Sequence, residues 1–97
     1  MGFFVTLNEA MAWVYILQSK TNGRFYIGST SDLQRRLDQH SSGHTQTTDR
    51  MGPSNLVLSQ EYTSLKEARS VEKKIKKLKR RDYVEKMIRD GRITMRP

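Results

Sequence analysis

WVYILQSKTNGRFYIGSTSDLQRRLDQH, residues 13–40, is the stretch that decides the fold of this 97-residue chain. It holds two runs rich in β-branched and aromatic residues, which favour β-strands. Between the two runs lies Asn22-Gly23, a dipeptide that readily supplies the positive φ of a hairpin turn. The stretch therefore predicts a strand, a tight turn and a second strand.

A helix is predicted to follow the second strand. Ser31 and Gln34 have the spacing of a capping box, which makes Ser31 the expected N-cap. Gly43 suits the left-handed residue that closes a helix, so the helix is expected to end near it. Leu33 and Leu37 form an apolar stripe, and that stripe must face the sheet to be buried.

Four polar side chains make this stretch a candidate for chemistry: Tyr15, Tyr26, Arg36 and His40. Arg36 and His40 are four residues apart, so they share one face of the predicted helix. With the leucine stripe turned to the sheet, that face points along the sheet edge, toward both tyrosines. Two phenols, a guanidinium and an imidazole could then converge on one phosphate group.

The rest of the chain predicts one more strand and two more helices. Residues 55–62 begin apolar and then alternate, as a strand does, and the polar segment before them predicts a loop. Ser64 and Glu67 repeat the capping-box spacing at the start of a long helix. A short third helix is expected to begin at Asp82 and to end at Gly91.

The predicted fold class is therefore α+β, a small three-stranded antiparallel sheet flanked by two or three helices. We expect residues 1–11 to be an N-terminal extension, residues 12–90 to form a single domain and residues 91–97 to be a loose basic tail. A chain of this length can bury one compact core but not two.

The net charge of +8 is unevenly distributed along the chain. Basic and acidic residues balance over residues 1–65, whereas residues 66–97 carry 13 basic and 5 acidic side chains. A basic segment on an otherwise neutral domain is typical of a protein that binds a polyanion. The alternative is a solvated helix face that keeps the protein soluble, but next to the four polar side chains we favour nucleic acid.

Several classes of protein are disfavoured by the composition. The chain has no cysteine, so it has neither a disulfide framework nor a thiolate zinc site. No apolar run is long enough to span a bilayer, and the N-terminus lacks the basic region of a secretory signal. We therefore expect a cytoplasmic location.

Glu72 is the most informative residue outside the opening stretch. It lies four residues after Ala68 and three before Ile75, and so on the apolar stripe of the long helix. A carboxylate at such a position is costly unless it has a partner. The partner could be a divalent cation, since Mg²⁺ often binds one or two carboxylates, water and substrate phosphate. It could instead be Lys76, four residues further on.

Residues 12–80 resemble the core of the GIY-YIG nuclease superfamily. Tyr26-Ile27-Gly28 is the second half of the family name, and Trp13-Val14-Tyr15 stands where Gly-Ile-Tyr would be, with its tyrosine kept. The ordered set continues with Arg36, His40 and the later Glu72. In size the chain is similar to the small single-domain bacterial members, which are related to a nuclease domain of the excision-repair machinery.

The resemblance implies an endonuclease that uses Mg²⁺ or Mn²⁺ to hydrolyse DNA phosphodiester bonds, with DNA repair or recombination as its setting. Glu72 would then bind the metal and Arg36 the scissile phosphate. Tyr26 would activate water with help from Tyr15, and His40 would be either the base or a hydrogen-bond donor to phosphate. Larger members often have an asparagine after the glutamate, but none follows Glu72, so weak activity is one interpretation.

The alternative function is a nucleic-acid-binding module with little or no catalysis. Either function would use the basic residues predicted to contact nucleic acid: Arg35, Lys73, Lys76, Lys77, Lys79, Arg80 and Arg81. DNA is the expected partner and RNA an open alternative. A chain this small has little surface for sequence readout, so a larger protein partner is a further expectation.

Overall fold

The computed structural model of the chain describes residues 11–41 and 52–97. The predicted N-terminal extension, except for Met11, therefore lies outside the described residues. So do Gly43, the expected end of the first helix, and most of the loop that follows it.

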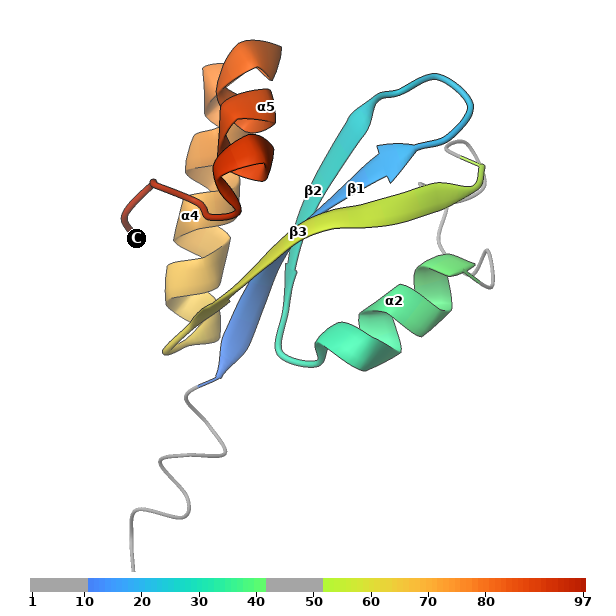
Figure 1. The fold of residues 1–97 in the computed structure, drawn as a ribbon. Helices are drawn as coiled ribbons and strands as arrows, with labels where there is room; N and C mark the ends of the chain where they lie inside the picture. The colour runs from blue at the N-terminus through green and yellow to red at the C-terminus, as the bar shows by residue number, and fades with distance from the viewer. Residues whose placement is uncertain (1–10, 42–51) are drawn as a thin grey trace, which may run out of the picture.

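Three antiparallel strands and three helices make up the described part of the chain (Figure 1). The strands are β1 (Ala12–Ser19), β2 (Phe25–Thr30) and β3 (Ser54–Tyr62), in the sheet order β2-β1-β3. The helices are α2 (Leu33–Ser41), α4 (Leu65–Leu78) and α5 (Arg81–Asp90). The predicted α+β class is confirmed. None of these helices is long and apolar enough to cross a membrane.

Strand β1 is covered on both faces, because α4 and α5 lie on one side of the sheet and α2 on the other (Figure 1). Val14 and Ile16 are fully buried on the α4 side. Tyr15 and Leu17 are buried on the α2 side. Burying side chains of this size stabilises a fold by about 1.5–3 kcal/mol each. The double cover explains why β1 is apolar almost throughout.

The helices bury the stripes that the sequence predicts. Leu33 and Leu37 of α2 pack against Tyr15 and Leu17. On the opposite face, the α4 stripe joins the core through buried residues: Ala68, Val71 and Ile75. The orientation of α2 is therefore fixed by its two leucines, and this orientation determines where the polar face of α2 points.

The turn between β1 and β2 is longer than a two-residue hairpin. Gly23 takes the positive φ, 74°, whereas Asn22 is not among the positive-φ residues. Asn22 instead accepts a hydrogen bond from the Arg24 N–H at 2.9 Å through its Oδ1. The side chain of Ser19 caps the turn by accepting the Thr21 N–H at 3.2 Å.

The prediction that Ser31 caps the first helix is wrong. Helix α2 begins at Leu33, and Asp32 Oδ1 accepts the Arg35 N–H at 3.1 Å. The Thr30 hydroxyl oxygen accepts the Asp32 N–H at 3.1 Å, which turns the chain so that Asp32, not Ser31, precedes the helix. A carboxylate there also interacts favourably with the helix dipole.

The other two helices start close to their predicted positions. Ser64 is the N-cap of α4, and its side chain accepts the Glu67 N–H at 3.1 Å, as predicted. Helix α5 begins at Arg81 instead of Asp82, a difference within the usual variation of helix ends. Gly91 closes α5 with φ 77°.

The segment after α5 is not a loose tail throughout. Ile93 is buried in the core, and its backbone N–H donates to Gln60 Oε1 at 2.7 Å. The Gln60 amide nitrogen in turn donates to the Ile93 carbonyl at 3.2 Å. The predicted looseness is therefore wrong for Ile93, because its apolar side chain completes the core on the α4 side.

Candidate active site

Both candidate tyrosines lie on the α2 face of the hairpin. The register of β1 and β2 pairs Tyr15 with Gly28, and Leu17 with Tyr26. Tyr15 is almost fully buried there, and Tyr26 is half-buried against the same cluster.

Gly28 is required by the position of the Tyr15 ring. A Cβ atom on Gly28 would lie 2.3 Å from the Tyr15 hydroxyl oxygen and 2.4 Å from its Cζ. The ring therefore lies directly over the Gly28 backbone, on an edge strand of the sheet. Only a glycine lets the phenol cross that strand, and so the Tyr15 hydroxyl reaches the edge of the sheet.

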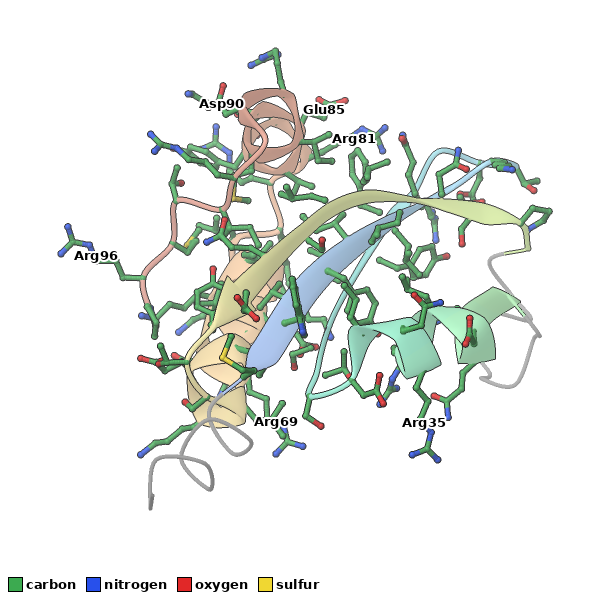
Figure 2. The ribbon with its side chains drawn as sticks, turned by 60° about the horizontal axis from the view of Figure 1, so that its bottom comes forward. Arg35, Arg69, Arg81, Glu85, Asp90 and Arg96 are labelled. Atoms are coloured by element: carbon green, nitrogen blue, oxygen red, sulfur yellow. The ribbon has the colours of Figure 1, made fainter. Side chains whose placement is uncertain are left out.

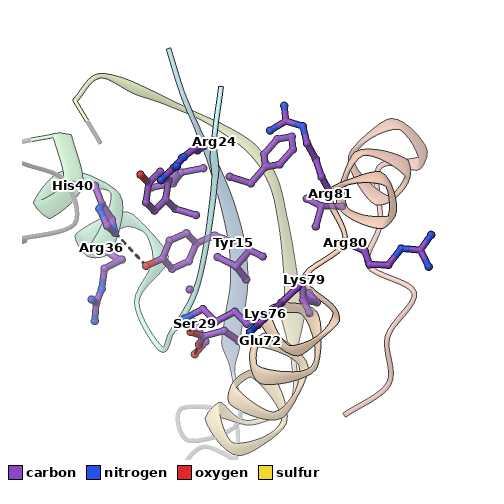
Figure 3. A pocket seen from close by; sticks show the side chains of 17 residues that line it. Tyr15, Arg24, Ser29, Arg36, His40, Glu72, Lys76, Lys79, Arg80 and Arg81 are labelled. Atoms are coloured by element: carbon purple, nitrogen blue, oxygen red, sulfur yellow. Dashed lines mark hydrogen bonds and ion pairs between the residues drawn. The ribbon is translucent and has the colours of Figure 1, made fainter. Parts of the chain in front are cut away.

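The Tyr15 hydroxyl is hydrogen-bonded to His40 Nε2 at 3.2 Å (Figure 3). The two rings meet edge to face, with centroids 5.8 Å apart. Burial raises the pKa of Tyr15, an effect that the nearby Arg36 opposes and Glu72 reinforces. Burial also lowers the pKa of His40, and Arg36 lowers it further. Near neutral pH Tyr15 is therefore protonated and His40 neutral, so their hydrogen bond joins two neutral groups, and the tautomer of His40 sets which of them donates.

Glu72 lies on the other side of β2, on helix α4. Its Oε1 accepts a hydrogen bond from the Ser29 hydroxyl, and its Oε2 lies 2.6 Å from the Lys76 ammonium. The glutamate side chain is only 20% exposed. The ion pair with Lys76 that the sequence allows is thus present, and Ser29 adds a second partner.

A groove of about 670 Å³ follows β2 and joins these two groups of residues (Figure 3). Tyr15, Arg36 and His40 line it from the α2 side, and Glu72 lines it from α4. Among the described residues that line the groove, Glu72 is the single carboxylate. Six are lysine or arginine: Arg24, Arg36, Lys76, Lys79, Arg80 and Arg81. Such a groove attracts an anionic ligand.

The groove brings together all five residues predicted to act in catalysis or metal binding: Tyr15, Tyr26, Arg36, His40 and Glu72. Of the residues predicted to bind nucleic acid, Lys76, Lys79, Arg80 and Arg81 line it. Arg35, Lys73 and Lys77 do not line it, and Arg35 points away from the sheet (Figure 2).

Two polar residues of the lining were not predicted from the sequence, Arg24 and Ser29. Strand alternation could have identified Ser29, because it follows Gly28 and must therefore face the opposite side of the sheet, toward α4. Arg24 belongs to the turn, where no periodicity applies.

The cations that line the groove differ in whether they already have a partner within the protein. The Arg81 guanidinium lies 4.6 Å from the Phe25 ring centroid and donates to the Gly23 carbonyl at 3.1 Å. Arg80 makes two hydrogen bonds to Asp82. In the described part of the chain, no carboxylate forms an ion pair with Arg24, Arg36 or Lys79. These three are the cations best able to take a new anion.

Glu72 is better suited to bind a cation such as Mg²⁺, which keeps water and substrate ligands, than a metal ion whose ligands all come from the protein. Mg²⁺ commonly binds one or two carboxylates and completes its shell with water and substrate phosphate. No group of three or more His, Cys, Asp or Glu side chains that could hold a metal occurs within residues 11–41 and 52–97. Glu72 would hold the ion, and the groove leaves room for water and phosphate beside it.

Residues 11–86 match the GIY-YIG catalytic domain family. The chain therefore belongs to the GIY-YIG family, and its function is of the nuclease type. The relatives that it resembles are UPF0213 proteins, a small GIY-YIG family, and the predicted resemblance is confirmed.

A UPF0213 protein of Streptococcus pneumoniae serotype 4 is 39% identical over 70 residues, which are 71% of this chain and 70% of that protein. The UPF0213 protein BH0048 of Halalkalibacterium halodurans is 40% identical over 70 residues, or 71% of this chain and 73% of that one. The solution NMR structure of the UPF0213 protein BH0048 from Bacillus halodurans aligns with TM-score 0.53 and 35% identity, over 84% of this chain and 86% of that chain. These names specify no substrate, metal or pathway.

The contact between Tyr15 and Gly28 can be tested by a double-mutant cycle. Gly28→Ala alone is expected to lower the free energy of unfolding by about 1–3 kcal/mol, because the new methyl group overlaps the phenol. In a Tyr15→Ala background the same change should cost much less, since the ring is gone. Urea denaturation of the four proteins gives the coupling. Additive effects would show that the ring does not lie over Gly28.

The lowered pKa of His40 predicts a pH dependence of stability. The unfolded chain takes up the imidazole proton near pH 6.5, whereas the folded chain takes it up only at lower pH. The unfolded state thus binds more protons in this window, so stability is present above about pH 6.5 and is lost as pH falls through the folded pKa.

Melting temperatures measured between about pH 7.5 and about pH 5 should fall less for His40→Gln than for the unmodified protein, because the variant lacks the imidazole that takes up the proton. The His40 pKa is measured directly by an NMR titration. The His40 signals are those missing from the spectrum of His40→Gln, which distinguishes them from the signals of His44. A His40 pKa at or above the ordinary value would contradict this account.

Proposed function

We propose that this protein is a metal-dependent endonuclease that hydrolyses DNA phosphodiester bonds in the groove along β2. The observation that carries the proposal is the arrangement of the groove. Arg36, His40 and Tyr15 line one side, Glu72 lines the other, and cations predominate among the charged residues of the lining. A phosphodiester bound there would meet a guanidinium, a neutral imidazole and a carboxylate at once.

Arg36 is proposed to hold the scissile phosphate. Its planar guanidinium can donate two parallel hydrogen bonds to phosphate oxygens. It lies close enough to Tyr15 and His40 to affect the pKa of both, and no described carboxylate is paired with it. The same guanidinium would stabilise the additional negative charge of the transition state.

His40 is the proposed proton acceptor for the attacking water. Burial and Arg36 lower its pKa, so its imidazole is neutral and can accept a proton near pH 7. Tyr15 is almost fully buried, and its raised pKa keeps it protonated, which suits a residue that orients His40 instead of one that removes a proton. Tyr26 lines the groove beside them and is proposed to position the water.

A Mg²⁺ or Mn²⁺ ion at Glu72 would supply Lewis-acid stabilisation of the leaving oxygen. DNA as the substrate, DNA repair or recombination as the setting, a larger partner that supplies specificity and a cytoplasmic location are further parts of the proposal. The family and the charge of the groove support DNA as the substrate, and the small surface of the chain supports a larger partner.

A nucleic-acid-binding module without catalysis is the second candidate. One observation favours it, because Ser29 and Lys76 already engage both carboxylate oxygens of Glu72. A protein that only binds would use the same cations but would have no need of Arg36 and Glu72 at facing sides of the groove.

Arg36→Ala should reduce cleavage about a hundredfold to a thousandfold, the usual effect of losing one donor to the transition-state charge. Arg35→Ala is the matched control, because Arg35 is the neighbouring arginine and points away from the groove. Cleavage is measured on single-stranded, duplex and branched DNA, with Mg²⁺ and with a chelator. Equal loss in both variants would assign the effect to net charge and remove Arg36 from the proposed role.

The binding part of the proposal predicts that the position of a cation matters. Arg24→Gln with Lys79→Gln should weaken DNA binding and lower the salt slope by about one for each lost phosphate contact. Arg35→Gln with Lys77→Gln removes the same charge outside the groove and should have the smaller effect. Fluorescence anisotropy at several salt concentrations measures both. Equal effects would place the DNA elsewhere on the surface.

A further inference from the structure

The carboxylate of Glu72 has two partners of very different kinds. Ser29 belongs to β2, and its short side chain holds Oε1 from the strand. Lys76 reaches Oε2 from one turn further along α4, through a long flexible stem. One oxygen is thus anchored to the sheet, and the other is neutralised by a side chain that can move away.

This ion pair differs from the other three described in the structure. The Glu72 side chain is 20% exposed, whereas the carboxylates of the pairs Arg80–Asp82, Arg81–Glu85 and Lys86–Asp90 are 63%, 51% and 38% exposed. The Glu72 carboxylate is therefore the least hydrated of the four, and its charge depends most on a protein partner. Lys76, at 55% exposure, can leave the pair without being buried elsewhere.

We propose that Lys76 competes with the divalent cation for Glu72. Its ammonium occupies the position at Oε2 that a cation would take, and a cation binds only when the ammonium moves away. Lys76 lines the groove, so the released ammonium can turn to a bound phosphate. This inference rests on the proposed function, because it assigns Lys76 a role toward the proposed metal site.

Because of this competition, the metal ion and the nucleic acid should bind with positive cooperativity. A phosphate that draws Lys76 away from Glu72 frees the carboxylate, and a metal that takes the carboxylate frees Lys76 for the phosphate. Thermodynamic linkage requires the two effects to be equal. The free protein should therefore bind the cation weakly, and the occupied groove should bind it more tightly.

The first measurement is calorimetric titration of Mg²⁺ and, separately, Mn²⁺ into the free protein. Lys76→Gln keeps most of the stem and removes the charge, so it should bind Mg²⁺ about fivefold or more tightly than the unmodified protein. Lys73→Gln is the matched control: it removes the same charge from the same helix, but Lys73 makes no described ion pair. At about 0.15 M salt its longer-range effect is largely screened, so its affinity should stay near that of the unmodified protein.

The second measurement is DNA affinity with and without Mg²⁺, in an Arg36→Ala background that slows cleavage enough for binding to reach equilibrium first. Mg²⁺ should tighten DNA binding, and adding Lys76→Gln should reduce that gain to what direct contact between the ion and a phosphate supplies. Equal Mg²⁺ affinities in the Lys76 and Lys73 variants, together with metal binding and cleavage by the unmodified protein, would overturn this inference alone. Absence of binding of either metal in every protein would overturn the proposed metal role as well.

Discussion

The candidate site depends on the contact between the Tyr15 ring and the Gly28 backbone. The register of the hairpin places the two residues opposite each other, and the missing side chain of Gly28 lets the phenol lie across an edge strand. Without that passage the Tyr15 hydroxyl could not meet His40 at the sheet edge. The glycine of Tyr26-Ile27-Gly28 therefore makes room for the Tyr15 ring, and the tyrosine of the same motif packs against the cluster of Tyr15 and Leu17.

Strand β2 separates the two halves of the candidate site, and this explains how a very small protein can form a groove lined from both faces of its sheet. Alternation along β2 sends Tyr26 toward α2 and Ser29 toward α4. Because β2 is at the edge of the sheet, residues from both faces can reach the same ligand around it. Arg81 joins α5 to the turn through Phe25 and the Gly23 carbonyl. Its charge therefore serves the fold as well as the electrostatic field of the groove.

The sequence predicts most of the fold, because its strands and helices follow strong periodic patterns. Leu33 and Leu37 face the sheet as expected, and Arg36 and His40 consequently line the groove. The errors are local. Asp32 caps α2 because the Thr30 hydroxyl sets the turn, and the hydrogen bonds of Gln60 to Ile93 span 33 positions of the chain. The Ser29–Glu72 contact was unpredictable for a related reason, since periodicity gives a residue its face but not its partner on another element.

The site residues come from distant parts of the chain, and this has a consequence for folding. The Tyr15–His40 bond joins positions 25 apart, and the Ser29–Glu72 bond joins positions 43 apart. The hairpin can form from local contacts, but neither bond can form until α2 and α4 have docked on opposite faces of the sheet. A nascent or partly unfolded chain therefore contains the tyrosines without the groove. Any hydrolytic activity that needs both halves of the groove would therefore be absent from a chain in which either helix is undocked.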